Sequence, residues 1–256
     1  MTGLQQRDYA MSFGPVAAQY QAHRPAYPPE LFEQLERLTG RPLRGADVLD
    51  VGAGTGIATR LLQARGARVT AVEPSAGMAA QLLAAAPGTP LVRAGGEELP
   101  FHDSTADLIT YAQAFHWTDP ARSVPEAIRV LRPGGALALW WNHPDSSVPW
   151  LAASRDRLVA ALTPYHPNVR PDSTAEPLAE HGLRVTEVEL AWERRTTVDS
   201  LVAELGSRSH LAVLPAEVRD ELLAAERAAL RVEFPDGSIL QPWRLSLSVG
   251  VGADVG

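Results

Sequence analysis

The chain has 256 residues, of which 45% are hydrophobic and 21% are charged, so we expect a single folded domain with a full hydrophobic core. It contains no cysteine, which excludes a disulfide framework, a thiolate nucleophile and a zinc–thiolate site. All 23 basic residues are arginine, which excludes a lysine Schiff base. The formal net charge is −7 and no basic run is present, which argues against binding to nucleic acid.

The same features predict the location of the protein and the kinds of partner that it lacks. The longest apolar runs are far too short to span a membrane, and residues 1–10 are polar, unlike the apolar segment of a signal peptide. Together with the absence of cysteine, this favours a cytoplasmic location. We expect no nucleic-acid or membrane partner, and a protein that is a monomer or homodimer.

The first half of the chain alternates between predicted strands and helices. After a polar arm with a short helix at 14–23, the predicted strands are 46–51, 68–73, 91–93, 107–112 and 136–142. The predicted helices are 29–38, 56–65, 75–85 and 123–131. Such alternation predicts an α/β fold with right-handed βαβ units, a parallel sheet and helices on both faces of that sheet.

The second half has a different order of elements. Its predicted helices are 150–162, 175–180, 198–204 and 216–231, and its predicted strands are 183–192 and 240–251. We expect these elements to complete the sheet and to add a helical lid. The whole chain, 1–256, is therefore predicted to be one domain.

The most informative motif is V-L-D-V-G-A-G-T-G, Val48–Gly56, at the end of the first predicted strand. Glycines at 52, 54 and 56 allow a sharp turn and a close approach of a ligand to the backbone. A dinucleotide-binding loop would read G-x-G-x-x-G, whereas here Ile57 occupies the place of the third glycine. No G-K-[ST] of a P-loop follows either. The spacing therefore suits a nucleoside without a pyrophosphate.

Two acidic residues accompany this loop. Glu73 ends the second predicted strand, where its carboxylate can accept hydrogen bonds from both hydroxyls of a ribose. Asp50 lies inside the first strand, where it would either order the loop or reach the amino group of an amino-acid tail. The alternative is a glycine turn that only packs a strand on a helix. The order strand, spaced glycines, helix, strand and acid favours the nucleoside site.

These residues resemble the class I S-adenosylmethionine-dependent methyltransferases. Val48–Gly56 is similar to their first motif and Glu73 to their ribose-binding acid. Further resemblance lies in the adenine loop, the fourth strand and the turn before the fifth strand, at Gly96–Phe101, Ala106–Trp117 and Leu131–Gly135. Relatives often carry an aspartate for the adenine amino group where this chain has Gly95, so backbone groups near Gly96 and Glu97 would take that place.

The resemblance, which spans about Asp47–Trp141, implies S-adenosyl-L-methionine as cofactor and S-adenosyl-L-homocysteine as product. It implies a Rossmann-like sheet of seven mostly parallel strands with helices on both faces, an N-terminal helical arm and a helical lid. The expected parts are a cap arm (1–40), a cofactor-binding core (41–142), and sheet completion with an acceptor lid (143–256). The cofactor residues implied are Arg24, Asp50, Gly52, Ala53, Gly54, Thr55, Gly56, Glu73, Pro74, Met78, Gly96, Glu97, Ala112 and Gln113.

A finer resemblance concerns the methyl acceptor. Phe13–Pro28, Ala114–Trp117 and Ser207–His210 look like a subgroup of small-molecule enzymes that includes trans-aconitate methyltransferase. This implies that the arm folds over the cofactor, with Tyr20 and Arg24 near the methionine tail and the acceptor. The alternatives are that Tyr20 packs as an aromatic ring and that Arg24 forms a surface ion pair.

Candidate catalytic residues follow the fourth and fifth strands. His116 can act as a general base on an O–H, N–H or acidic C–H acceptor, or it can pack against Trp117. Trp140, Trp141 and Trp150 could form an aromatic acceptor wall, or some of them could be buried. We predict His116 and Tyr20 as catalytic residues. The predicted substrate contacts are Tyr20, His116, Trp117, Trp141, His143, Arg208 and His210, and no metal site is predicted because the histidine spacing offers none.

The predicted function is methyl transfer to a small molecule, in specialised (natural-product) metabolism. The acceptor could be a carboxylate, a phenol, an amine or an electron-rich ring carbon such as that of indole. A second hypothesis is a protein that binds S-adenosylmethionine without methylating anything. A nicotinamide-dependent oxidoreductase is disfavoured by the spacing of the glycine loop.

Overall fold

The computed structural model describes residues 26–162, 175–206, 211 and 214–252, and a seven-stranded sheet lies at its centre. The strands are β1 (Asp47–Val51), β2 (Arg68–Val72), β3 (Leu91–Val92), β4 (Ala106–Ala112), β5 (Leu131–Pro144), β6 (Arg184–Thr197) and β7 (Ser238–Val251). Their order is β3-β2-β1-β4-β5-β7-β6. β1 to β5 pair in parallel, whereas β7 pairs antiparallel with β5 and β6. The predicted seven-stranded, mostly parallel sheet is confirmed.

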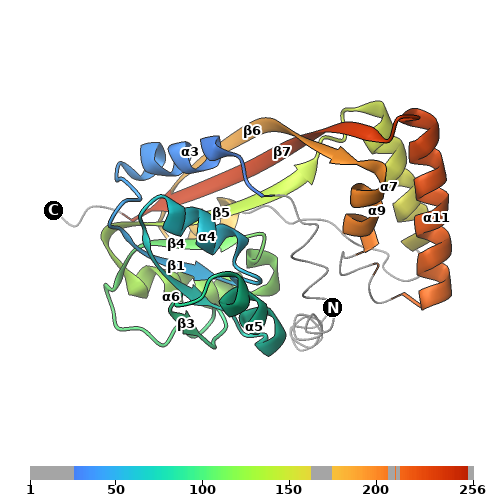
Figure 1. Cartoon of the computed structure of the whole chain (residues 1–256). Coiled ribbons are helices and arrows are strands. Elements are labelled where there is room, and N and C mark those ends of the chain that lie inside the picture. The colour runs from blue at the N-terminus through green and yellow to red at the C-terminus, as the bar shows by residue number, and fades with distance from the viewer. Residues whose placement is uncertain (1–25, 163–174, 207–210, 212–213, 253–256) are drawn as a thin grey trace.

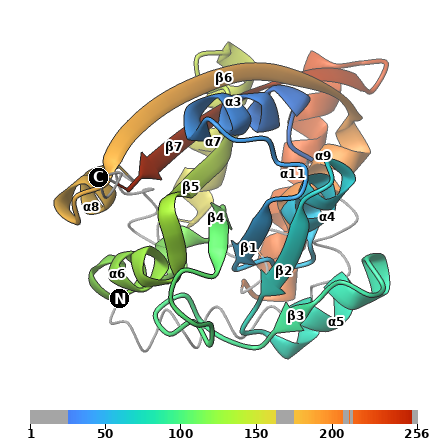
Figure 2. The same cartoon turned by 90° about the vertical axis from the view of Figure 1, so that its left-hand side faces the viewer.

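Helices cover both faces of this sheet, as Figure 2 shows. α3 (Pro29–Thr39) and α4 (Ile57–Ala64) pack on one face, and α6 (Pro120–Val130) and α8 (Ala175–Glu180) pack on the other. The two faces are apolar because strand side chains alternate between them. In β4, for example, Leu108 joins the core under α3 and α4, and its neighbour Ile109 joins the core under α6.

Local sequence signals set several helix ends. Gly40 adopts the left-handed conformation after α3, with φ of +65°, as expected for a glycine that ends a helix. The predicted cap at Ser75 is confirmed, since its hydroxyl accepts the backbone N–H of Met78 at the start of α5 (Ala76–Ala85). α6 begins three residues before the predicted helix, because Asp119 caps it and Pro120 suits its first position.

The other helices of the second half form a separate layer, which we call the lid helices: α7 (Pro149–Leu162), α9 (Val198–Gly206) and α11 (Ala216–Glu233). β6 and β7 extend beyond the sheet as a long ribbon that leads to these helices (Figure 1). Leu158, Val202 and Leu230 come from the three helices and belong to one buried cluster, which is distinct from the two cores of the sheet. The lid therefore has a small core of its own.

The start of the described chain is anchored to the sheet. The Asn142 side chain on β5 donates to the carbonyl of Ala26 at 3.4 Å and accepts the indole N–H of Trp192 on β6 at 3.1 Å. The arm that precedes Ala26, including the predicted helix at 14–23, lies outside the described residues, and the division into three parts stays a prediction. In the part of the chain that the structure covers, no helix has both the length and the apolar character needed to cross a membrane.

Candidate active site

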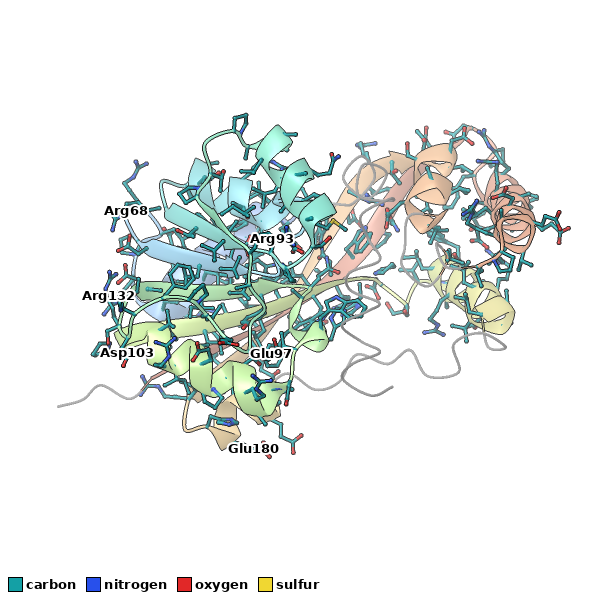
Figure 3. The ribbon with its side chains drawn as sticks, turned by 90° about the horizontal axis from the view of Figure 1, so that it is seen from below. Arg68, Arg93, Glu97, Asp103, Arg132 and Glu180 are labelled. Carbon is teal, nitrogen blue, oxygen red and sulfur yellow. The ribbon has the colours of Figure 1, made fainter. Side chains whose placement is uncertain are left out.

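A cavity of about 670 Å³ lies where the parallel strands end. Its walls include the segments after β1, β2 and β3, the end of β4 and the segment that follows it, and Tyr27. In an open α/β sheet, ligands bind at this edge, where the strand order reverses between β1 and β4. Figure 3 shows Arg93 and Glu97, two lining residues, at the end of the sheet nearer the lid helices. Arg68 and Arg132, which pair with Asp47, lie at the opposite end.

The glycine loop has a backbone that only glycine adopts at little cost. Gly52, Gly54 and Gly56 have φ angles of +68°, +57° and +80°. A Cβ on Gly52 would overlap the Cβ of Ala114, and a Cβ on Gly56 would lie 2.7 Å from the Leu82 side chain. Gly52 and Gly54 line the cavity, whereas Gly56 packs behind it at the start of α4. A direct cofactor contact by Gly56 was predicted, and the structure does not support it, because this glycine faces Leu82.

Glu73 is fixed at the wall of the cavity by two backbone groups. Its carboxylate accepts the N–H of Gly54 at 2.8 Å through Oε2 and the N–H of Ser75 at 2.7 Å through Oε1. The side chain is buried, and this burial raises the pKa of Glu73, while the two backbone N–H groups act in the opposite direction. Because each carboxylate oxygen can accept more than one hydrogen bond, both remain able to accept one from a ligand.

Asp50 lies beneath the loop and does not reach the cavity. It is fully buried, and it accepts the hydroxyls of Thr59 at 2.6 Å and Thr110 at 2.9 Å. Burial raises the pKa of Asp50 to about 6. The predicted contact between Asp50 and the cofactor is therefore not supported. The other predicted role, ordering of the loop, fits, because Asp50 ties β1 to α4 and β4.

Two buried hydroxyls in the cavity wall have no hydrogen-bond partner among the described residues. They are Thr55 Oγ1 and the phenol oxygen of Tyr111, and both residues line the cavity. Burial raises the pKa of Tyr111, so its phenol is a neutral O–H donor. Buried polar groups are nearly always hydrogen-bonded in folded proteins. These two hydroxyls therefore fit a polar ligand that would satisfy them.

The loop after β3 approaches the same phenol. A Cβ on Gly96 would lie 2.5 Å from the Tyr111 oxygen, so glycine is needed for this close packing. A Cβ on Gly95 would lie 2.9 Å from Oε2 of Glu97. Relatives often carry an aspartate at the position of Gly95. In this chain a carboxylate also lies beside that position, and it belongs to Glu97.

The segment after β4 carries backbone strain. Gln113 has a φ of +57°, which is uncommon for a residue other than glycine. Its backbone N–H donates to the carbonyl of Trp140 at 2.9 Å, and its side chain donates to the Tyr27 hydroxyl at 3.3 Å. Such strained residues cluster at functional sites. Tyr27 also lines the cavity and was not predicted as a site residue, although it belongs to the arm whose resemblance was noted.

His116 lies in a short 3₁₀ helix, Phe115–Trp117, that follows β4 and was not predicted. Both His116 and Trp117 line the cavity, and their ring centroids are 4.5 Å apart. Behind them, the indole N–H of Trp141 on β5 donates to Nδ1 of His116 at 3.4 Å. Trp141 is itself buried in the core under α6 and does not line the cavity, so the predicted contact between Trp141 and the substrate is not supported.

Of the two alternatives for the three tryptophans, the structure supports burial and not an aromatic acceptor wall, since Trp140 and Trp141 are buried and none of the three lines the cavity. Trp140 and Trp141 are neighbours on β5, so they point to opposite faces of the sheet and join different cores. Trp150 packs edge-on against Phe234 among the lid helices, with ring centroids 5.1 Å apart. His143 pairs in the sheet with Arg244 and is not part of the cavity wall, so its predicted substrate contact is not supported either.

The remaining predicted residues divide into those at the cavity and those outside the described chain. The cavity is lined by thirteen of them: Gly52, Ala53, Gly54, Thr55, Glu73, Pro74, Met78, Gly96, Glu97, Ala112, Gln113, His116 and Trp117. Tyr20, Arg24, Arg208 and His210 lie outside the described residues, and their roles stay predictions. Lining residues that were not predicted include Tyr27, Arg93, Tyr111 and Arg122. Within the described ranges, no group of three or more acidic or histidine residues could hold a metal ion.

Known proteins are similar to this chain in sequence and in fold. A family model described as a methyltransferase domain matches residues 49–139. An uncharacterized methyltransferase of Mycobacterium tuberculosis is 37% identical over 224 residues, which are 88% of this chain and 87% of the relative. The chain belongs to the class I S-adenosylmethionine-dependent methyltransferases. The cavity described above is therefore the candidate active site of a methyltransferase.

Two other similar proteins extend this comparison. A malonyl-[acyl-carrier protein] O-methyltransferase of Pectobacterium atrosepticum is 30% identical over 189 residues, 70% of this chain and 71% of that protein. A solved structure from Anaeromyxobacter dehalogenans, described as a type II methyltransferase, has a TM-score of 0.65 and 27% identity, and covers 90% of this chain and 97% of its own. The finer likeness to the trans-aconitate methyltransferase subgroup stays a prediction.

Proposed function

We propose that this methyltransferase binds S-adenosylmethionine in the cavity and transfers its methyl group to a small-molecule acceptor. The observation that carries the proposal is the Glu73 carboxylate, held at the cavity wall by the N–H groups of Gly54 and Ser75. Vicinal hydroxyls of a ribose are suitable donors to such a carboxylate. The neighbouring G-x-G-x-G loop leaves space for a nucleoside because side chains are absent at its turns.

The rest of the wall fits the same ligand. Thr55 Oγ1 and the Tyr111 phenol need polar partners, which a nucleoside with an amino-acid tail can supply. When bound, S-adenosylmethionine supplies a methyl group activated by its sulfonium. The protein then has to hold the acceptor in line with that methyl group and to exclude water. The strained Gln113 segment and Tyr27 are the described residues best placed to shape this part of the cavity.

His116 is the residue that we place beside the acceptor. It lines the cavity directly after β4, and a histidine at this point can either remove a proton from the acceptor or hold it by a hydrogen bond. Oxygen is one candidate methyl acceptor, since a relative that shares 30% of its residues is by name an O-methyltransferase. We propose a role in specialised metabolism, in the cytoplasm, as a monomer or homodimer without a nucleic-acid or membrane partner.

The experiment that tests the proposal follows the methyl group. The protein is incubated with S-adenosylmethionine labelled on the methyl carbon and with a panel of carboxylic acids, phenols, amines and indoles. Labelled product that disappears in the Glu73→Ala variant supports methyl transfer at this site. Binding of the labelled cofactor without product over the whole panel favours the second hypothesis, a protein that binds S-adenosylmethionine and does not methylate.

A further inference from the structure

The hydrogen bond between Trp141 and His116 limits the chemistry that His116 can perform. An indole nitrogen has a hydrogen and no lone pair to share, so it can only donate. Nδ1 of His116 therefore accepts this hydrogen bond at 3.4 Å and carries no proton itself. The ring proton of the neutral imidazole is then on Nε2. A positively charged imidazole has N–H groups at both nitrogens and would place two donors against each other at this contact.

The two partners are held in place by different parts of the fold. Trp141 lies within β5, where its backbone pairs with Ser246 of β7, and its side chain is 7% exposed in the core under α6. His116 is held by the 3₁₀ helix after β4 and by its contact with the ring of Trp117. Since the sheet fixes the indole, the imidazole has to adapt to it. Trp141, which donates this hydrogen bond, thus lies in the core, and His116, which accepts it, lies in the cavity wall.

We infer that Trp141 is a positioning residue that fixes His116 as a hydrogen-bond donor through Nε2–H. This N–H would donate to a methyl acceptor that binds as an oxyanion. A general base at this position would need its lone pair on Nε2, and the Trp141 contact places that lone pair on Nδ1 instead. A histidine that donates a hydrogen bond suits a methyl acceptor that reacts without first losing a proton. Among the acceptor classes considered for this cavity, a carboxylate meets that condition near neutral pH.

Methyl transfer to a carboxylate then needs no general base. A carboxylate oxygen supplies its lone pair to the methyl carbon, and the new oxygen–carbon bond forms as the carbon–sulfur bond breaks. The electron pair of the broken bond remains on sulfur, so the sulfonium becomes a neutral thioether and the carboxylate becomes a neutral ester. No proton enters or leaves. The Nε2–H of His116 orients the carboxylate, and the chain needs no further acid or base. This inference rests on the proposed function, but its first test is independent of turnover.

The first test reads the tautomer of His116 directly. Long-range ¹H–¹⁵N correlation spectra of the ¹⁵N-labelled protein distinguish a protonated from an unprotonated ring nitrogen, and the His116→Gln variant assigns the signal. We expect protonated Nε2 and unprotonated Nδ1 in the wild type. In Trp141→Phe, which removes the donor and keeps an aromatic ring, we expect a mixture of both tautomers. A wild-type ring protonated at Nδ1 would overturn the inference, whatever the protein does with S-adenosylmethionine.

A matched control separates the hydrogen bond from the loss of a large side chain. Trp140 is the next residue on the same strand, is fully buried, and its indole N–H has no hydrogen-bond partner among the described residues. Trp140→Phe should therefore leave the His116 tautomer unchanged while removing a similar volume from the core. Melting curves of both variants identify any that fail to fold. A tautomer that changes equally in both variants would assign the effect to packing and would overturn the role of Trp141.

The second test uses methyl transfer to separate a donor from a base. A glutamine side chain can donate a hydrogen bond but cannot act as a base near neutral pH. With a panel of carboxylic acids and phenols as acceptors, we expect turnover with the acids. On those acids, His116→Gln should keep its rate within about 10-fold of the wild type, and His116→Ala should lose roughly 10-fold to 100-fold, the scale of one hydrogen bond to a charged group. Equal losses in both variants, or turnover only with phenols, would overturn the inference.

Discussion

The Glu73 carboxylate accepts the backbone N–H of Gly54 at 2.8 Å, although the two residues are 19 positions apart in the chain. This contact joins the end of β2 to the glycine loop after β1. The loop N–H helps to set the position of the carboxylate, and the carboxylate satisfies that N–H. The carboxylate and the glycine turn therefore lie side by side in the cavity wall.

The glycine loop gives the first prediction, through Gly52→Ala. The added Cβ would overlap the Cβ of Ala114, in addition to the cost of a φ of +68°. Gly40→Ala is the matched control, since Gly40 has a similar φ of +65° but no atom within 4 Å of the position that a Cβ would take. We expect urea unfolding to show a loss of about 1 kcal/mol for Gly40→Ala and about 2 kcal/mol more for Gly52→Ala. Equal losses would show that the contact with Ala114 has no role.

The buried carboxyl of Asp50 predicts a dependence of stability on pH. The folded state holds this proton up to about pH 6, whereas the unfolded carboxyl releases it near its ordinary pKa of 3.8. The folded state thus binds more protons between these values, and the contribution of Asp50 to stability falls as the pH rises through this window. Relative to Asp50→Asn, the wild type should lose about 2 kcal/mol of unfolding free energy between about pH 4.5 and about pH 7.

Urea titrations of both proteins at several pH values provide the measurement for Asp50. The difference between two proteins that share all other titrating groups isolates this one carboxyl. A difference that stays constant over the window would mean that Asp50 titrates alike in the folded and unfolded states. A difference that grows in favour of the wild type with rising pH would give the opposite sign and would contradict the burial argument.

The lid helices give a third prediction. Glu226 on α11 is 1% exposed and accepts two hydrogen bonds from Arg157 on α7, at 2.7 and 2.9 Å. Arg157→Met leaves this buried carboxylate without its partner, which should cost about 3 kcal/mol. Arg155→Met is the control, because Arg155 pairs with Asp156 on the surface, where such pairs contribute less than about 1 kcal/mol. Hydrogen exchange should show faster exchange in the lid helices of Arg157→Met, and unchanged protection there would contradict the prediction.

Most of the fold could be predicted because its signals are local. β1, β2 and β4 are apolar strands, and Ser75 and Gly40 mark the ends of helices by their own side-chain chemistry or by the lack of a side chain. α6 begins before its predicted start, because its first turn is set by Asp119 and Pro120 and not by the apolar pattern that follows. The 3₁₀ helix at Phe115–Trp117 was missed, since three residues of such a helix leave no periodic pattern.

Site residues whose position follows from the course of the backbone could be predicted from the sequence. Residues whose role depends on the direction of the side chain were harder to predict. Glu73 and Gly52 follow strand ends, so their place at the cavity follows from topology. Asp50 and Trp141 lie inside strands, and the sequence alone does not show which face of the sheet each one meets. Tyr27 was missed because its place depends on a hydrogen bond with Gln113, 86 residues away.

Isothermal titration calorimetry of S-adenosylhomocysteine with the wild type and with Glu73→Ala tests the cofactor site most directly. Glu30→Ala, which removes an exposed carboxylate on α3, is the control. We predict one site in the wild type, an unchanged affinity for Glu30→Ala, and an affinity weakened by about 1.5–3 kcal/mol for Glu73→Ala, because a charged acceptor of the ribose hydroxyls is lost. Unchanged affinity in Glu73→Ala, or binding of NADH in place of S-adenosylhomocysteine by the wild type, would contradict the assignment of this cavity to S-adenosylmethionine with Glu73 on its ribose.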